Sequence, residues 1–150
     1  MDNDDVISTV NGLIQTSRDG EQGFRTCAED VDSPTLKTVF NEAAQRCGRS
    51  AAELETKVRA MGGDPATGGS VGGSLHRAWV DIKSKITGKD EKAILEECER
   101  GEDAAKRAYN SALEQELPVD IRALVEKQYQ GVKQNHDRIR DLRNAYRVQA

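Results

Sequence analysis

The chain has 150 residues, 32% of them charged and 36% hydrophobic, and its net charge of −4 at pH 7 argues against a nucleic-acid partner. Aromatic residues make up only 4% of the chain, and no apolar run approaches the ~18 residues that span a bilayer. We therefore expect a soluble, cytoplasmic, all-α protein of one domain over residues 1–150, without a membrane partner.

Two helices are predicted for the first part of the chain, over residues 5–30 and 34–61. In both segments apolar residues recur at steps of three and four, which places them on one helix face. Ser33 and Pro34 are typical of an N-cap and the first helical position, and Gly62-Gly63 ends the second helix. The short turn between the two segments predicts an antiparallel hairpin.

A glycine-rich crossover over residues 62–89 follows, and within it residues 75–86 are predicted to form a short helix. Its single apolar stripe favours packing on the outside of the bundle, with Trp79 as the anchor because an indole ring covers much apolar area. His76 lies on the same short helix, where we expect it to hydrogen-bond to the bundle surface rather than to bind a ligand.

Two further helices are predicted over residues 90–116 and 119–147, separated by Pro118. They form a second antiparallel hairpin. The long crossover can run the length of the bundle, so the helices over 34–61 and 90–116 can lie parallel to each other. This one-crossover topology predicts a ferritin-like four-helix bundle.

Two Gly-Glu steps, Gly20-Glu21 and Gly101-Glu102, fall midway along the first and third long helices, on the stripes that face the core. A buried carboxylate is costly unless it is paired with a cation or holds a metal. We therefore predict a polar layer at one depth inside the bundle.

One interpretation of this layer is a metal centre, since four-helix bundles bind two irons or manganeses through glutamates and Glu-x-x-His pairs on facing helices. No cofactor is certain from the residues alone; iron or manganese would suit this donor set. The candidate ligands are Glu21, Glu42, Glu99, Glu102 and His136.

The ligand pattern is incomplete, which leaves a second interpretation open. Gln45 stands where the first Glu-x-x-His pair needs its histidine, and Lys133 stands where the second needs its carboxylate. Arg46 also brings a cation toward the layer. A salt-bridged layer would pair Glu21 with Arg46, and His136 with Glu99 or Glu102. A dinuclear metal centre, a single weakly bound metal and a paired structural layer all remain as alternatives.

Four short motifs carry a resemblance to a known family: Asp19-Gly20-Glu21-x-Gly23-Phe24, Leu75-His76-x-x-Trp79, the run Ala93-Ile94-Leu95-x-x-Cys98-Glu99-x-Gly101-Glu102, and His136-x-x-Ile139. Over nearly the whole chain, the sequence resembles the bacterial four-helix-bundle proteins of the ferritin-like superfamily that are grouped as a domain of unknown function. The resemblance implies a ferritin-like bundle and an association with bacterial stress responses. It does not supply a reaction.

Three functions are compatible with these residues. The leading hypothesis is a binding or structural protein without an assigned reaction. A di-iron or di-manganese oxidase is the enzymatic alternative, and a module for homo-oligomerisation through the crossover helix is the third. The cysteines, Cys27, Cys47 and Cys98, are far apart in the sequence, so we expect buried thiols rather than a zinc site or a disulfide framework.

Overall fold

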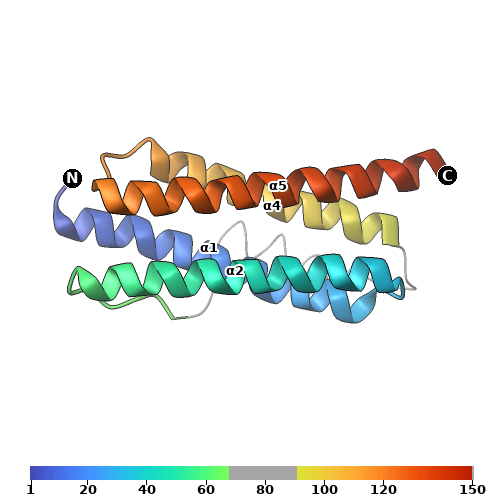
Figure 1. Ribbon diagram of the computed structural model, residues 1–150, viewed down its shortest axis with the longest axis horizontal. Helices are drawn as coiled ribbons and strands as arrows, with labels where there is room; N and C mark the ends of the chain where they lie inside the picture. Colours follow the sequence, from blue (N-terminus) through green and yellow to red (C-terminus); the bar gives the residue numbers. More distant parts are fainter. Residues whose placement is uncertain (68–90, 150) are drawn as a thin grey trace.

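The protein is described by a computed structural model over residues 1–67 and 91–149. Its described helices are α1 (Asn3–Asp30), α2 (Pro34–Ala60), α4 (Glu91–Leu113) and α5 (Val119–Gln149). Helices α1 and α2 form one antiparallel hairpin, α4 and α5 form another, and α2 runs parallel to α4 (Figure 1). The predicted ferritin-like bundle is thereby confirmed. The predicted crossover helix, with His76 and Trp79, lies outside the described residues.

The helix ends follow from short-range hydrogen bonds. Helix α1 begins earlier than predicted because Asp2 caps it: the Asp5 backbone N–H donates to Asp2 Oδ1 at 2.9 Å. Ser33 caps α2 as expected, accepting from the Leu36 N–H at 3.3 Å. Just beyond α2, Gly62 has a φ of +81°, a left-handed conformation that favours glycine.

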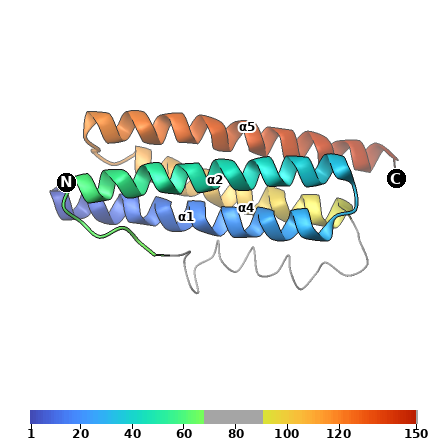
Figure 2. The ribbon, with the colours of Figure 1, turned by 60° about the horizontal axis from the view of Figure 1, so that its bottom comes forward.

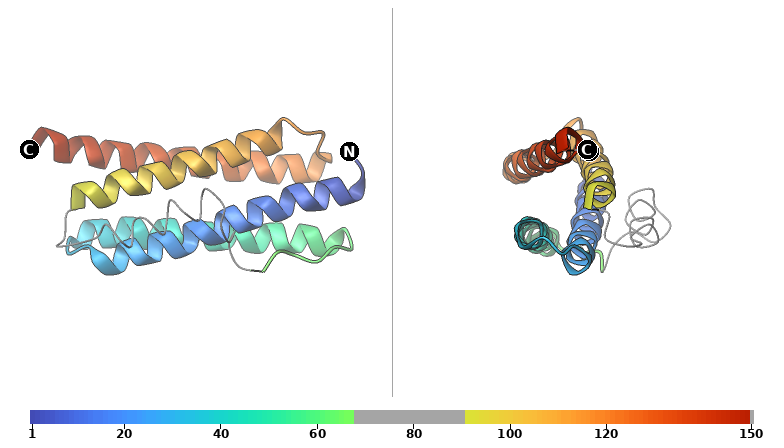
Figure 3. Two further views of the ribbon diagram at one scale, coloured as in Figure 1. Left: turned by 180° about the vertical axis from the view of Figure 1, so that it is seen from behind. Right: turned by 90° about the vertical axis from the view of Figure 1, so that its right-hand side faces the viewer.

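The two hairpins pack against each other mainly through α1 and α4. Helices α2 and α5 are also neighbours, but they pack less extensively than the other neighbouring helix pairs. Helices α1 and α2 lie side by side along their length (Figure 2). Viewed end on, α4 lies above α1 on one side of the bundle and α5 lies above α2 on the other (Figure 3, right). The α2–α5 side is therefore the less closely packed side.

Two apolar clusters fill the interior, one toward each end of the bundle. The first contains Phe24 and Phe40, whose rings stack with centroids 6.2 Å apart, together with Ile139. The second contains Val10 and Leu54 among its fully buried residues. Between them each helix contributes buried polar residues, which form the polar layer: Ser17, Ser50, Glu102, Gln128, Asn135 and His136. Polar side chains are thus buried inside the bundle, although the set differs from the one expected from the sequence.

All three cysteines are buried and free. The structure brings two of them together across the contact between the hairpins: Cys27 Sγ on α1 lies 3.2 Å from Cys98 Sγ on α4. Burial raises the pKa of the Cys98 thiol, which makes it a poor nucleophile in the folded state. The proximity of these two thiols was not visible in their sequence spacing.

Refolding of the reduced, denatured chain with oxidised glutathione should therefore produce a disulfide between Cys27 and Cys98. Folding places these two sulfurs in contact, and the open chain lets the oxidant reach them. Mass spectrometry of non-reduced peptides measures the pairing. The Cys98→Ser variant should lose this product, and abundant pairing through Cys47 would contradict the packing of α1 on α4.

Candidate functional site

Glu102 is the centre of the polar layer. It lies on α4 with only 2% of its surface exposed. Its Oε1 accepts from Arg46 Nη2 on α2 at 3.1 Å and from Asn135 Nδ2 on α5 at 2.8 Å. One carboxylate oxygen therefore ties three helices together through charge-assisted hydrogen bonds.

Burial raises the pKa of Glu102, and the opposing effects of the Arg46 charge and the Asn135 hydrogen bond do not cancel this rise. The other oxygen, Oε2, has no hydrogen-bond partner among the described residues. Glu102 lines a small cavity of about 20 Å³, which is enough room for one water molecule. The carboxyl group thus occupies a polar but confined environment.

A second hydrogen-bonded group adjoins Glu102 along the same cavity. The Tyr109 hydroxyl donates to Gln128 Oε1 at 2.8 Å and lies 3.3 Å from Ser17 Oγ. Gln128 Nε2 in turn donates to the Ser50 carbonyl on α2 at 3.2 Å. Burial raises the pKa of Tyr109, so the phenol remains protonated at neutral pH. The group connects all four described helices with neutral hydrogen bonds.

Cys47 faces the same cavity. Burial raises the pKa of its thiol to about 12, although the neighbouring Arg46 charge opposes this rise. A thiol with this pKa carries almost no thiolate at neutral pH. Cys47 is therefore not an activated nucleophile.

Glu21 lies apart from Glu102, in the contact between α1 and α2. Its carboxylate pairs with Arg18 and Arg25, each at 3.0 Å, and a Cβ at Gly48 would collide with its Oε2. The predicted pair between Glu21 and Arg46 is therefore wrong. Arg18 and Arg25 lie about one turn to either side of Glu21 on the same helix and reach it first.

Glu42 and Gln45 lie on the exposed side of α2. Glu42 Oε2 pairs with Arg138 Nη1 of α5 at 2.8 Å, with about half of each side chain exposed. The α2 residues that matched the ligand spacing thus point away from the layer, while their neighbour Arg46 points into it.

His136 lies in the polar layer between α4 and α5, where its ring nitrogens face carboxylates other than Glu102. Its Nε2 is 2.7 Å from Asp103 Oδ1 and 3.9 Å from Glu99 Oε1, and Glu99 also pairs with Arg143. The predicted approach of Glu99 to His136 is present. Asp103 was not among the predicted site residues, although its position four residues after Glu99 puts both carboxylates on one face of α4.

These positions do not fit a dinuclear metal centre. Glu102, Glu21 and Glu42 face three different surroundings, and each is engaged by arginine. Over residues 1–67 and 91–149, no three His, Cys, Asp or Glu side chains are arranged to hold a metal ion. The positive charge nearest the central carboxylate belongs to the Arg46 guanidinium.

Two hairpins, a single long crossover and a polar layer between two apolar clusters define a ferritin-like four-helix-bundle protein. The chain belongs to the family described as a domain of unknown function (DUF2383), whose model matches residues 5–115. No curated protein matches the sequence. Within the described ranges, no helix is both long and apolar enough to span a membrane.

Solved structures share this fold at low sequence identity. A two-domain protein from Anabaena variabilis, with DJ-1/ThiJ/PfpI-like and ferritin-like domains, is 13% identical with a TM-score of 0.78; the match covers 100% of this chain but only 39% of that one. The conserved hypothetical protein rv2844 from Mycobacterium tuberculosis is 10% identical with a TM-score of 0.76, over 95% of this chain and 99% of that chain. A ferritin-like, diiron-carboxylate protein from Bacillus anthracis is 17% identical with a TM-score of 0.70, over 97% and 99% of the respective chains.

Proposed function

We propose that this protein is a ferritin-like binding protein in which the Arg46 guanidinium takes the place of a metal cation in the polar layer. The single observation that carries the proposal is the hydrogen bond from Arg46 Nη2 to Glu102 Oε1 at 3.1 Å. Arg46 compensates the buried carboxylate with a charge that cannot dissociate as a metal ion can. The protein would then act by binding, in keeping with the stress-related role that its family resemblance implies.

Two features support a layer without metal chemistry. Asn135 donates to the same Oε1 that Arg46 contacts, so this oxygen is already engaged by two donors. The cavity beside Glu102, at about 20 Å³, has room for one water rather than for two metal ions with their bridging ligands.

Titration of the purified protein with ferrous and manganous ions tests the proposal. We expect no binding in the layer and an unchanged melting temperature, because a metal that bound only the folded state would raise it. Glu102→Gln is the variant that changes the polar layer. Glu42→Gln is its control, because Glu42 belongs to an exposed ion pair outside the layer.

A di-iron or di-manganese oxidase is the second candidate, and the diiron-carboxylate name of the Bacillus anthracis protein is the observation that favours it. On that account the titration would reach about two metal ions per chain, and Glu102→Gln would abolish binding while Glu42→Gln would not. This result would overturn the proposal.

A homo-oligomer remains a prediction. Among the described residues the only large hydrophobic side chains that are exposed are Met1 and Val119, at 44% and 87%. These two do not form an apolar interface of the usual size. Light scattering coupled to size-exclusion chromatography gives the number of chains per particle directly.

A further inference from the structure

A groove runs between α2 and α5, on the less closely packed side of the bundle. Two hollows of about 330 and 520 Å³ lie along this seam, and they share Arg46, Arg49 and Gly131 in their walls. We call the two together the α2–α5 groove. Gly131 helps to open it, because any side chain there would begin 3.3 Å from Arg46 Cδ.

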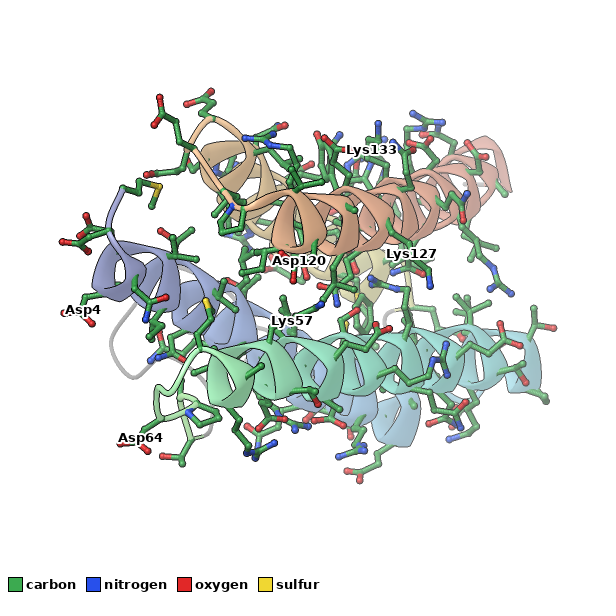
Figure 4. The ribbon with its side chains drawn as sticks, turned by 60° about the vertical axis from the view of Figure 1, so that its left-hand side comes forward. Asp4, Lys57, Asp64, Asp120, Lys127 and Lys133 are labelled. Atoms are coloured by element: carbon green, nitrogen blue, oxygen red, sulfur yellow. The ribbon has the colours of Figure 1, made fainter. Side chains whose placement is uncertain are left out.

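Two ion pairs between α2 and α5 flank the groove, and Gln128 lies in its wall. Lys57 Nζ meets Asp120 Oδ2 at 3.2 Å at one end, as Figure 4 shows from that side, and Arg138 meets Glu42 at the other. Between them Gln128 bridges the helices. The side chains that bridge α2 and α5 along this groove are therefore polar.

The charges that line the groove are predominantly positive. Its cations are Arg46, Arg49, Lys127 and Arg138, and its carboxylates are Glu42 and Glu53. With Glu102, which pairs with Arg46 from inside the bundle, the local charge is +1 on a chain whose net charge is −4. Positive charge concentrated in a cleft with low-dielectric walls attracts anions.

Two of these cations have no carboxylate of their own. Arg46 is held by Glu102 and Arg138 by Glu42, and Glu53 accepts a hydrogen bond from Gln128 Nε2 at 3.3 Å. Among the described residues, Arg49 and Lys127 have neither an ion pair nor a side-chain hydrogen bond. Both line the larger hollow, Arg49 from α2 and Lys127 from α5. In Figure 4 Lys127 lies on the side of α5 toward α2, whereas Lys133 lies on the opposite side.

We propose that the α2–α5 groove binds a small phosphate-bearing molecule, with Arg49 and Lys127 contacting its phosphoryl oxygens. A guanidinium presents paired donors that match two phosphoryl oxygens, and a lysine adds a compact charge. A volume of about 520 Å³ lies in the range of small-molecule sites. The inference rests on the proposed function as a binding protein and names the chemical class of its ligand.

Calorimetric titration with inorganic pyrophosphate tests the inference. The wild type should bind it, and the double variant Arg49→Gln/Lys127→Gln should bind at least roughly tenfold more weakly, as expected for the loss of charge-assisted hydrogen bonds. The matched control is Arg59→Gln/Lys133→Gln, which removes the same charge from the same two helices outside the groove. It should bind pyrophosphate within about twofold of the wild type, since screened distant charges contribute little.

Absence of pyrophosphate binding by the wild type, or an equal loss in both double variants, would overturn the inference. Circular dichroism of each variant checks that the bundle is folded, which is expected because both groove cations lack protein partners. The metal titration and the pyrophosphate titration have independent outcomes. If metal binds in the layer and pyrophosphate binding is intact, only the proposed function is contradicted. If the layer binds no metal and the wild type binds no pyrophosphate, only this inference is contradicted.

Discussion

Replacement of Arg46 by methionine should lower the free energy of unfolding by about 3 kcal/mol at neutral pH, the lower end of the range for breaking a buried ion pair. The substitution keeps a long apolar side chain but leaves Glu102, only 2% exposed, without its cation. We choose the lower end because the Arg46 side chain is still 20% exposed, so water screens part of the interaction. Urea denaturation followed by circular dichroism measures the change.

The loss should depend on pH in a defined direction. Without Arg46, the folded-state pKa of Glu102 rises further above its ordinary value of 4.5. Burial raises this pKa, and the Arg46 charge that lowers it is then gone. A group with a raised folded-state pKa binds its proton more tightly in the folded state. Its contribution to stability is therefore fully present below pH 4.5 and is lost as the pH rises through the folded-state pKa. The difference between wild type and variant should shrink on acidification.

Two further variants separate this account from a general effect of charge. Arg49→Met removes a neighbouring arginine without a carboxylate partner and should change stability by no more than about 0.5 kcal/mol. Arg46→Met combined with Glu102→Leu removes both members of the pair and should recover much of the loss. A loss of stability in Arg46→Met that is equal at all pH values would contradict the role assigned to Glu102.

Replacement of Phe40 by alanine should cost about 3–5 kcal/mol, which makes it the most destabilising single change that we expect. Phe40 is fully buried and stacks on Phe24, and its removal leaves a cavity in the cluster at the α1–α2 turn end of the bundle. Because packing rather than charge is lost, the cost should not shrink on acidification. Val119→Ala, at an exposed position, is the control and should stay within about 0.5 kcal/mol. A loss below about 1 kcal/mol for Phe40→Ala would contradict the buried packing of α1 on α2.

The helices and their topology could be predicted from local signals. Ser33-Pro34 and Gly62 mark helix boundaries through hydrogen bonding and backbone conformation, which depend on a few neighbouring residues. The predicted start of α1 was too late. The capping box there is formed by Asp2 and Asp5 rather than by the usual Ser or Thr with Glu or Gln. The length of the crossover allowed α2 and α4 to lie parallel, and the structure has them so.

The partners inside the layer could not be predicted in the same way. Glu102 was expected to be buried, but its pairing with Arg46 and Asn135 depends on how one hairpin slides and rotates against the other. Asn135 and His136 are consecutive on α5, so a rotation of that helix by one residue, roughly 100°, exchanges one for the other as the neighbour of Glu102. Glu21 illustrates the competing local effect, since Arg18 and Arg25 on its own helix reach its carboxylate. The contact between Cys27 and Cys98 depends on the same register.

The exchange of a metal cation for the Arg46 guanidinium is tested most directly by anomalous diffraction at the iron absorption edge, with crystals grown in ferrous salt. We expect no iron peak at bonding distance from Glu102, and continuous density from the Arg46 guanidinium to Glu102 Oε1. An iron peak coordinated by Glu102, with Arg46 displaced from the layer, would contradict the account.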